Sequence, residues 1–166
     1  MAEILIGTSG YAFIGWIGNV YPKDTKQEDF LGIYSGLFRT VELNSSYYKM
    51  PDQKSLSELL VDSSKNLTFA IKAHRFLTTD INPAMWQNEA NTYLMHGMDV
   101  EAWRGKNDND RFNYLYTDKE IEALTIRIKR IAKQARRVLI YFNNHPSGYS
   151  VQNAQMLEKM MRKAGK

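Results

Sequence analysis

The chain contains no cysteine, so disulfide bonds and thiolate chemistry are excluded. It has only three histidines, His74, His96 and His145, so a metal site would also need carboxylate ligands. It lacks the uninterrupted apolar run of roughly 18 residues that a membrane-spanning helix requires. Its first residues also lack the basic start of a signal peptide. We therefore expect a cytoplasmic protein that has no association with a membrane.

Familiar catalytic motifs are missing as well. The segment Gly7-Thr8-Ser9-Gly10 is too short to form a phosphate-binding P-loop. Neither a Ser-His-Asp order nor the HExxH spacing of zinc proteases occurs. The sequence thus indicates no particular metal, cofactor or reaction.

The composition is that of one globular domain. The chain has 166 residues, of which 43% are hydrophobic and 24% charged. The net charge is +4, and much of the positive excess lies in 127–137 and 159–166, on the polar faces of expected helices. This pattern favours a solvated surface, with a nucleic-acid-binding patch as the alternative.

Strand-like and helix-like segments alternate along the chain. Apolar or alternating runs predict strands over 4–6, 40–48, 67–73, 93–97 and 138–142, with a turn over 7–10. Helices are expected after capping residues Thr25, Asp52, Thr117 and Ser150. We expect Leu56, Leu59 and Leu60 to face inward and the helix after Thr117 to reach Ala135. Strands separated by helices predict a mainly parallel sheet.

Polar side chains gather where the expected strands end. Because side chains alternate along a strand, Glu42 and Asn44 share one face, as do Lys72 and His74. Parallel strands would bring these residues to one edge of the sheet, where ligands bind in such folds. The candidate catalytic residues are Glu42, His74 and His96. The candidate ligand-binding residues are Ser9, Asn44, Lys72, Tyr141 and Asn143.

Structural roles compete with these assignments. Glu42 and Lys72 would form an ion pair if their strands are neighbours, which would then serve only to stabilise the interior. His145 lies beside Pro146 in a loop, so we expect it to face solvent. Aromatic residues near the start of the chain are expected in the core or at the rim of the sheet; they are Tyr11, Trp16, Tyr21, Tyr47 and Tyr48.

Several motifs, in order, resemble the YecE-like family (domain of unknown function 72). The motifs are Ile6-Gly7-Thr8-Ser9-Gly10-Tyr11, Thr40-Val41-Glu42-Leu43-Asn44, Phe69-Ala70-Ile71-Lys72-Ala73-His74, Met95-His96-Gly97 and Val138 to Asn144. The resemblance implies a TIM-barrel-like fold with a site at the strand ends, and it implies no established reaction.

The chain departs from this family in its middle. Only residues 80–91 stand between Thr79 and Thr92, where family members carry several more strands and helices. An eight-stranded barrel takes about 200 residues or more. We therefore expect a single domain over 1–166 that lacks the middle segment, with the deletion near 80–92. Its expected form is an open barrel of about five strands, or a chain that self-associates across the gap.

Three functions remain open. The first is an enzyme or former enzyme that binds a small phosphorylated or polyhydroxy ligand, with Glu42 as a base or metal ligand and Lys72 holding an anion. The second is a nucleic-acid-binding protein, on the basis of the basic helices. The third is a non-catalytic remnant that acts as an assembly module, on the basis of the shortened middle.

Overall fold

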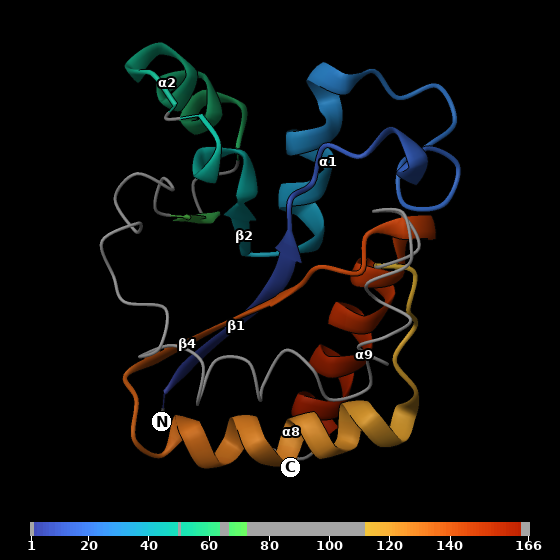
Figure 1. Ribbon diagram of the computed structural model, residues 1–166, viewed down its shortest axis with the longest axis vertical. Helices are drawn as coiled ribbons and strands as arrows, with labels where there is room; N and C mark the ends of the chain where they lie inside the picture. Colours follow the sequence, from blue (N-terminus) through green and yellow to red (C-terminus); the bar gives the residue numbers. More distant parts are fainter. Residues whose placement is uncertain (1, 50, 64–66, 73–111, 164–166) are drawn as a thin grey trace.

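The computed structural model describes residues 2–49, 51–63, 67–72 and 112–163 (Figure 1). Its strands are β1 (Glu3–Ser9), β2 (Thr40–Leu43), β3 (Thr68–Ile71) and β4 (Arg137–Phe142). Its α-helices are α1 (Phe30–Leu37), α2 (Gln53–Asp62), α8 (Asp118–Ala132) and α9 (Tyr149–Lys163). Short 3-10 helices are η1 (Ile14–Trp16), η2 (Gln27–Asp29), η3 (Asn44–Tyr47) and η4 (Pro146–Gly148).

The four strands form one parallel sheet in the order β3-β2-β1-β4. The predicted α/β class with mainly parallel strands is therefore confirmed. In the part of the chain that the structure describes, the sheet is open, with β3 and β4 at its two edges. The strand predicted over 93–97 lies outside the described residues.

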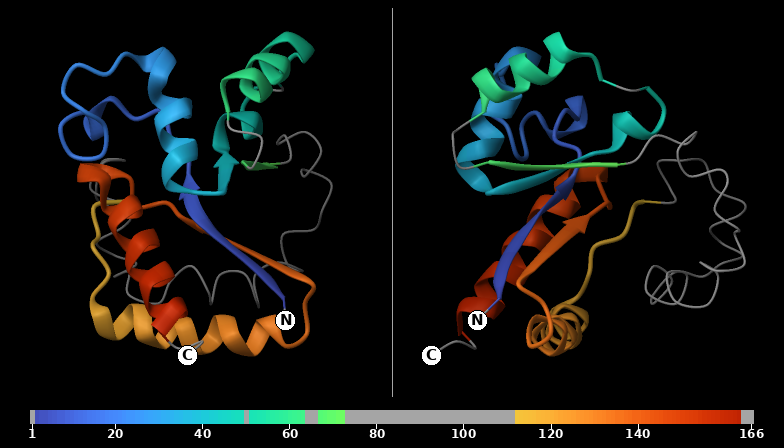
Figure 2. Two further views of the ribbon diagram at one scale, coloured as in Figure 1. Left: turned by 180° about the vertical axis from the view of Figure 1, so that it is seen from behind. Right: turned by 90° about the vertical axis from the view of Figure 1, so that its left-hand side faces the viewer.

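The two faces of the sheet differ in character. One face packs through residues such as Ile6, Val41 and Phe142 against apolar side chains of the helices. Helix α9 contacts β1 and β4, and Figures 1 and 2 show α8 and α9 beside these strands. The opposite face carries Glu42 and Tyr141, which alternate with those core residues along their strands. This second face leads up to the polar strand ends.

Strand lengths differ from the prediction. The expected turn over 7–10 is wrong up to Ser9, because Gly7, Thr8 and Ser9 pair with neighbouring strands and continue β1. Strand β2 ends at Leu43 instead of residue 48, because the chain turns into η3. Pairing with strands distant in the sequence therefore overrides the local turn pattern.

Helix starts and ends also differ in part. The capping box at Thr117 is confirmed, and Asp52 caps α2 by accepting a hydrogen bond from Ser55 N. The cap at Thr25 is wrong, since α1 begins at Phe30 after a 3-10 turn. Ser150 is not a cap because α9 already begins at Tyr149.

Two further details of the helices were predicted incorrectly. Leu60 is 69% exposed, because the short helix α2 turns this side chain outward. Helix α8 ends at Ala132, three residues before Ala135. None of the helices among the described residues is long and apolar enough to cross a membrane.

Candidate ligand-binding site

A chain of hydrogen bonds connects the ends of β1, β2 and β3. Ser9 Oγ, at the end of β1, donates to Glu42 Oε2 at 2.5 Å. Asn44 Nδ2, just after β2, donates to Ser9 Oγ at 2.5 Å. Lys72 Nζ, just after β3, donates to Asn44 Oδ1 at 3.4 Å. The four residues thus form one connected polar cluster, in which every donor points toward Glu42.

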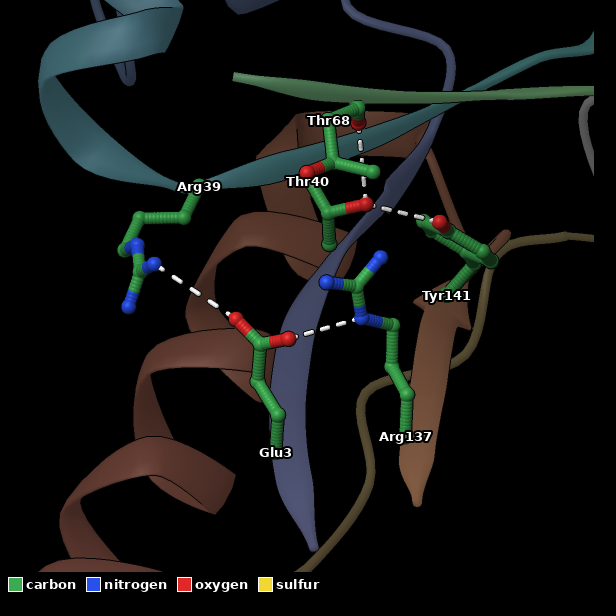
Figure 3. Close-up of polar contacts among 6 residues, drawn as sticks. All are labelled: Glu3, Arg39, Thr40, Thr68, Arg137 and Tyr141. Atoms are coloured by element: carbon green, nitrogen blue, oxygen red, sulfur yellow. Dashed lines mark hydrogen bonds and ion pairs between the residues drawn. The ribbon is translucent and has the colours of Figure 1, made fainter. Parts of the chain in front are cut away.

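A second set of hydrogen bonds lies below this cluster, on the same face of the sheet (Figure 3). Thr40 Oγ1 donates its single hydrogen to Thr68 O at 3.0 Å, so Tyr141 OH is the donor in its 2.7 Å contact with Thr40 Oγ1. Burial, and then the charge of Glu42, raise the pKa of Tyr141. The phenol therefore stays protonated and remains a hydrogen-bond donor beneath the cluster.

A pocket of about 830 Å³ opens above the strand ends. Ser9, Asn44, Lys72 and Asn143 line its base, one from each strand end. Glu42 lies behind Ser9 and does not line the pocket itself. The volume falls in the range of roughly 300–1,000 Å³ that is typical of sites for small ligands.

Aromatic rings line the pocket beyond the end of β4. The ring of Phe13 stacks on His145 with centroids 4.7 Å apart and planes 6° apart. Trp16 packs on Phe13 at 4.9 Å, and Phe112 packs on His145 at 5.3 Å. Trp16 Nε1 also donates to His145 O at 2.7 Å. We call these four residues the aromatic column; three of them, Phe13, Phe112 and His145, line the pocket.

Two local features hold this column in place. Gly10 adopts a φ of 87°, a conformation that favours glycine, and a Cβ there would lie 2.9 Å from the ring of Phe13. After β4, Asn144 Nδ2 donates to Tyr114 O at 2.6 Å and to Asn153 Oδ1 at 2.8 Å. These bonds anchor the backbone between Asn143 and His145.

The expectation that His145 faces solvent is wrong. Its ring is half-buried between Phe13 and Phe112, residues that are remote from it in the sequence. Burial lowers the pKa of His145, because the charged imidazolium is poorly solvated there. The imidazole is therefore neutral at pH 7.

The structure brings together most of the residues predicted for the site. Ser9, Glu42, Asn44 and Lys72 form the polar cluster, Asn143 lines the pocket and Tyr141 lies below it. His74 and His96 lie outside the described residues. The predicted ion pair between Glu42 and Lys72 is wrong, because Asn44 stands between them and takes the contact from Lys72.

The aromatic side of the pocket was not predicted from the sequence. Phe13 and Phe112 carry no chemical motif, and aromatic residues near the start of the chain were assigned to the core or rim. That assignment holds for Trp16 and Tyr21, which are 1% and 2% exposed. No local pattern indicates that Phe13 meets His145, because the contact joins the ends of β1 and β4.

The described residues offer no cluster of three or more His, Asp or Glu side chains that would hold a metal ion. Charged side chains around the pocket are instead balanced in sign. Lys49 and Lys72 carry positive charge, and Asp52 and Glu58 of the α2 region carry negative charge. The hydrogen bond from Ser55 keeps the pKa of Asp52 below its usual value, so this carboxylate is ionised.

Comparison with known proteins gives a consistent result. The family model described as "Protein of unknown function DUF72" matches residues 5–100 and 95–166. None of the curated proteins matches the chain.

Crystal structures of DUF72 family proteins share the fold. One from Thermotoga maritima is 19% identical with a TM-score of 0.76, covering 96% of this chain and 99% of that chain. One from Enterococcus faecalis is 13% identical with a TM-score of 0.72, covering 96% of each chain. These likenesses confirm the TIM-barrel-like α/β fold, and they carry no information on the ligand.

Proposed function

The chain belongs to the DUF72 family of proteins of unknown function, and from this premise we propose that it binds a small polyhydroxy or phosphorylated ligand at the carboxyl ends of its strands. The observation that carries the proposal is the connected polar cluster of Ser9, Glu42, Asn44 and Lys72 at the base of the pocket. Ligands of parallel α/β folds bind at this end of the strands.

The cluster has hydrogen-bonding capacity left for a ligand. Lys72 uses one of its three ammonium hydrogens on Asn44, and Asn44 uses one of its two amide hydrogens on Ser9. Both residues therefore have donors for a hydroxyl or phosphate oxygen. Ser9 Oγ gives its hydrogen to Glu42 and has a lone pair left, so it accepts from a ligand hydroxyl.

Glu42 acts through Ser9 in this arrangement. Its carboxylate orients the serine hydroxyl, so that the serine oxygen faces the pocket as an acceptor. Lys72 is kept near the pocket by its contact with Asn44 and by the face of Tyr47, whose ring centre lies 5.4 Å from Nζ. A ligand that both donates and accepts hydrogen bonds, as a polyol does, matches the whole cluster.

The test is thermal unfolding of the full chain with glucose, glucose 6-phosphate, ribose or ribose 5-phosphate. A ligand at about 100 times its dissociation constant stabilises the folded state by about 2.7 kcal/mol. For a protein of this size the melting temperature then rises by roughly 5–10 °C. We expect at least one of these compounds to give such a shift.

Lys72→Met is the informative variant, because Lys72 is exposed and its loss leaves the core intact. We expect the thermal shift to fall markedly in this variant. Lys133→Met is the matched control, since it removes the same charge at the exposed end of α8, away from the pocket. The proposal is wrong if no compound shifts the melting temperature, or if both variants respond as the unmodified chain does.

A further inference from the structure

The polar cluster occupies only part of the pocket. Strand order places Lys72 at the β3 side of the base, then Asn44, then Ser9, and the aromatic column beyond the end of β4. The row from β3 to β4 covers three strand spacings, or roughly 14 Å. A single sugar ring covers only a part of this row, so the pocket has room for a second group over the aromatic column.

The aromatic column offers a surface unlike the polar cluster. Phe13, Phe112 and His145 are half-buried, and each lines the pocket. Their rings already stack on one another, so they present apolar carbon edges and the end of the stack to a ligand. Aromatic edges favour contact with the face of another planar ring. Because burial keeps His145 neutral at pH 7, a neutral planar ring meets no charge there.

Charge around the pocket limits the charge of the ligand. Two lysines, Lys49 and Lys72, face two carboxylates, Asp52 and Glu58. Glu42 adds a further carboxylate directly behind Ser9. A ligand with several phosphates would need an excess of positive charge, as P-loops and arginine clusters provide, and the described lining residues contain no arginine. A ligand with no phosphate or one phosphate fits this balance.

We infer that the ligand of this pocket is a nucleoside or nucleoside monophosphate, with its base against the aromatic column, its ribose hydroxyls on Ser9 and Asn44, and its far end toward Lys72. The inference rests on the proposed function and narrows its ligand class. The three parts of such a molecule occur in the same order as the three parts of the pocket. Neither a sugar phosphate nor an isolated planar ring uses both sides.

Isothermal titration of the full chain tests this assignment with adenosine, AMP, UMP, ATP and ribose 5-phosphate. We expect adenosine or a monophosphate to bind at least about fivefold more tightly than ribose 5-phosphate, the lower end of what stacking of a base on an aromatic ring contributes. ATP is expected to bind no more tightly than AMP, because the pocket has balanced charge.

Phe13→Leu removes a ring of the column while keeping an apolar side chain. We expect it to weaken mononucleotide binding at least about fivefold and to leave ribose 5-phosphate binding unchanged. Phe69→Leu is the matched control, because Phe69 is also half-buried and lies outside the pocket lining. If Phe13→Leu fails to fold, as its melting curve would show, Phe112→Leu at the other end of the column replaces it.

The outcomes separate this inference from the proposed function. If ribose 5-phosphate binds as tightly as AMP and Phe13→Leu affects neither, the inference is overturned while the proposed function stands. If none of the compounds binds, both are overturned. If only a short single-stranded oligonucleotide binds, with an affinity that falls steeply with salt, the ligand is a nucleic acid and the mononucleotide assignment is wrong.

Discussion

Tyr34 of α1 places its hydroxyl group between β1 and β2. The group accepts a hydrogen bond from Thr8 N at 3.0 Å and donates to Thr40 O at 3.0 Å. It therefore bridges two main-chain groups that would otherwise be buried without partners. Burial raises the pKa of Tyr34 to about 12, so the phenol keeps its donor hydrogen throughout the range in which proteins are studied. Gly7 leaves space for this bridge, since a Cβ there would lie 2.1 Å from Thr40 O.

Tyr34→Phe should lower the unfolding free energy by about 1–3 kcal/mol, because the buried Thr8 N–H and Thr40 C=O lose their partner. Urea denaturation measures the loss as a lower midpoint at an unchanged slope. Tyr149→Phe is the control, since Tyr149 is half-buried at the start of α9 and is not part of this bridge. A loss of less than about 0.5 kcal/mol in Tyr34→Phe, the range of an ordinary surface substitution, would contradict this role.

At the scale of a single element, α8 owes its start to Thr117. The Thr117 hydroxyl accepts from Glu120 N at 3.4 Å, and Glu120 Oε2 accepts from Thr117 N at 2.8 Å. The hydroxyl of Tyr114 also donates to Glu120 at 2.5 Å, and this bond contributes most to the lowered pKa of Glu120. The carboxylate therefore stays ionised next to the positive end of the helix dipole.

Thr117→Ala should lower the unfolding free energy by about 1 kcal/mol, as the loss of a capping side chain does in other helices. Thr25→Ala is a matched control, because Thr25 and Glu28 have the same spacing in the sequence but α1 starts only at Phe30. We expect a change within about 0.5 kcal/mol for Thr25→Ala. Equal losses in the two variants, measured by urea denaturation, would show that the cap at α8 is not the cause.

At the scale of the whole molecule, Glu3 connects the first strand to the last one (Figure 3). Its carboxylate accepts a hydrogen bond from Arg137 Nε at 2.7 Å, and Arg39, just before β2, lies 3.6 Å away. These contacts hold together three strands at the end of the sheet opposite the pocket. All three side chains are partly exposed, with 38% for Glu3, so their contribution is screened by solvent.

Glu3→Gln should lower the unfolding free energy by less than about 1 kcal/mol at low salt. In about 1 M salt, where the Debye length is about 3 Å, the loss should shrink. Glu28→Gln is the control, since Glu28 pairs only with the nearby Lys26 on the surface, at 3.6 Å. Urea denaturation of both variants at the two salt concentrations is the measurement, and a loss that does not depend on salt would point to packing of Glu3 instead of its charge.

The sequence alone determined the features that depend on neighbouring residues. The alternation of strands and helices predicted a parallel α/β sheet, and the period of two in each strand placed Ser9, Asn44 and Lys72 at one edge. The capping box at Thr117 was equally predictable. Each of these features is decided by side-chain periodicity or by hydrogen bonds that span a few residues.

The tertiary structure decided which of these groups meet. Gly7 and Thr8 belong to β1 because β4, more than a hundred residues later, pairs with them. Lys72 contacts Asn44 because β2 lies beside β3, and His145 stacks on Phe13 because β4 lies beside β1. Such contacts join segments that are distant in the chain, and their geometry follows from strand order and packing. A local sequence pattern therefore contains neither the partner nor the orientation.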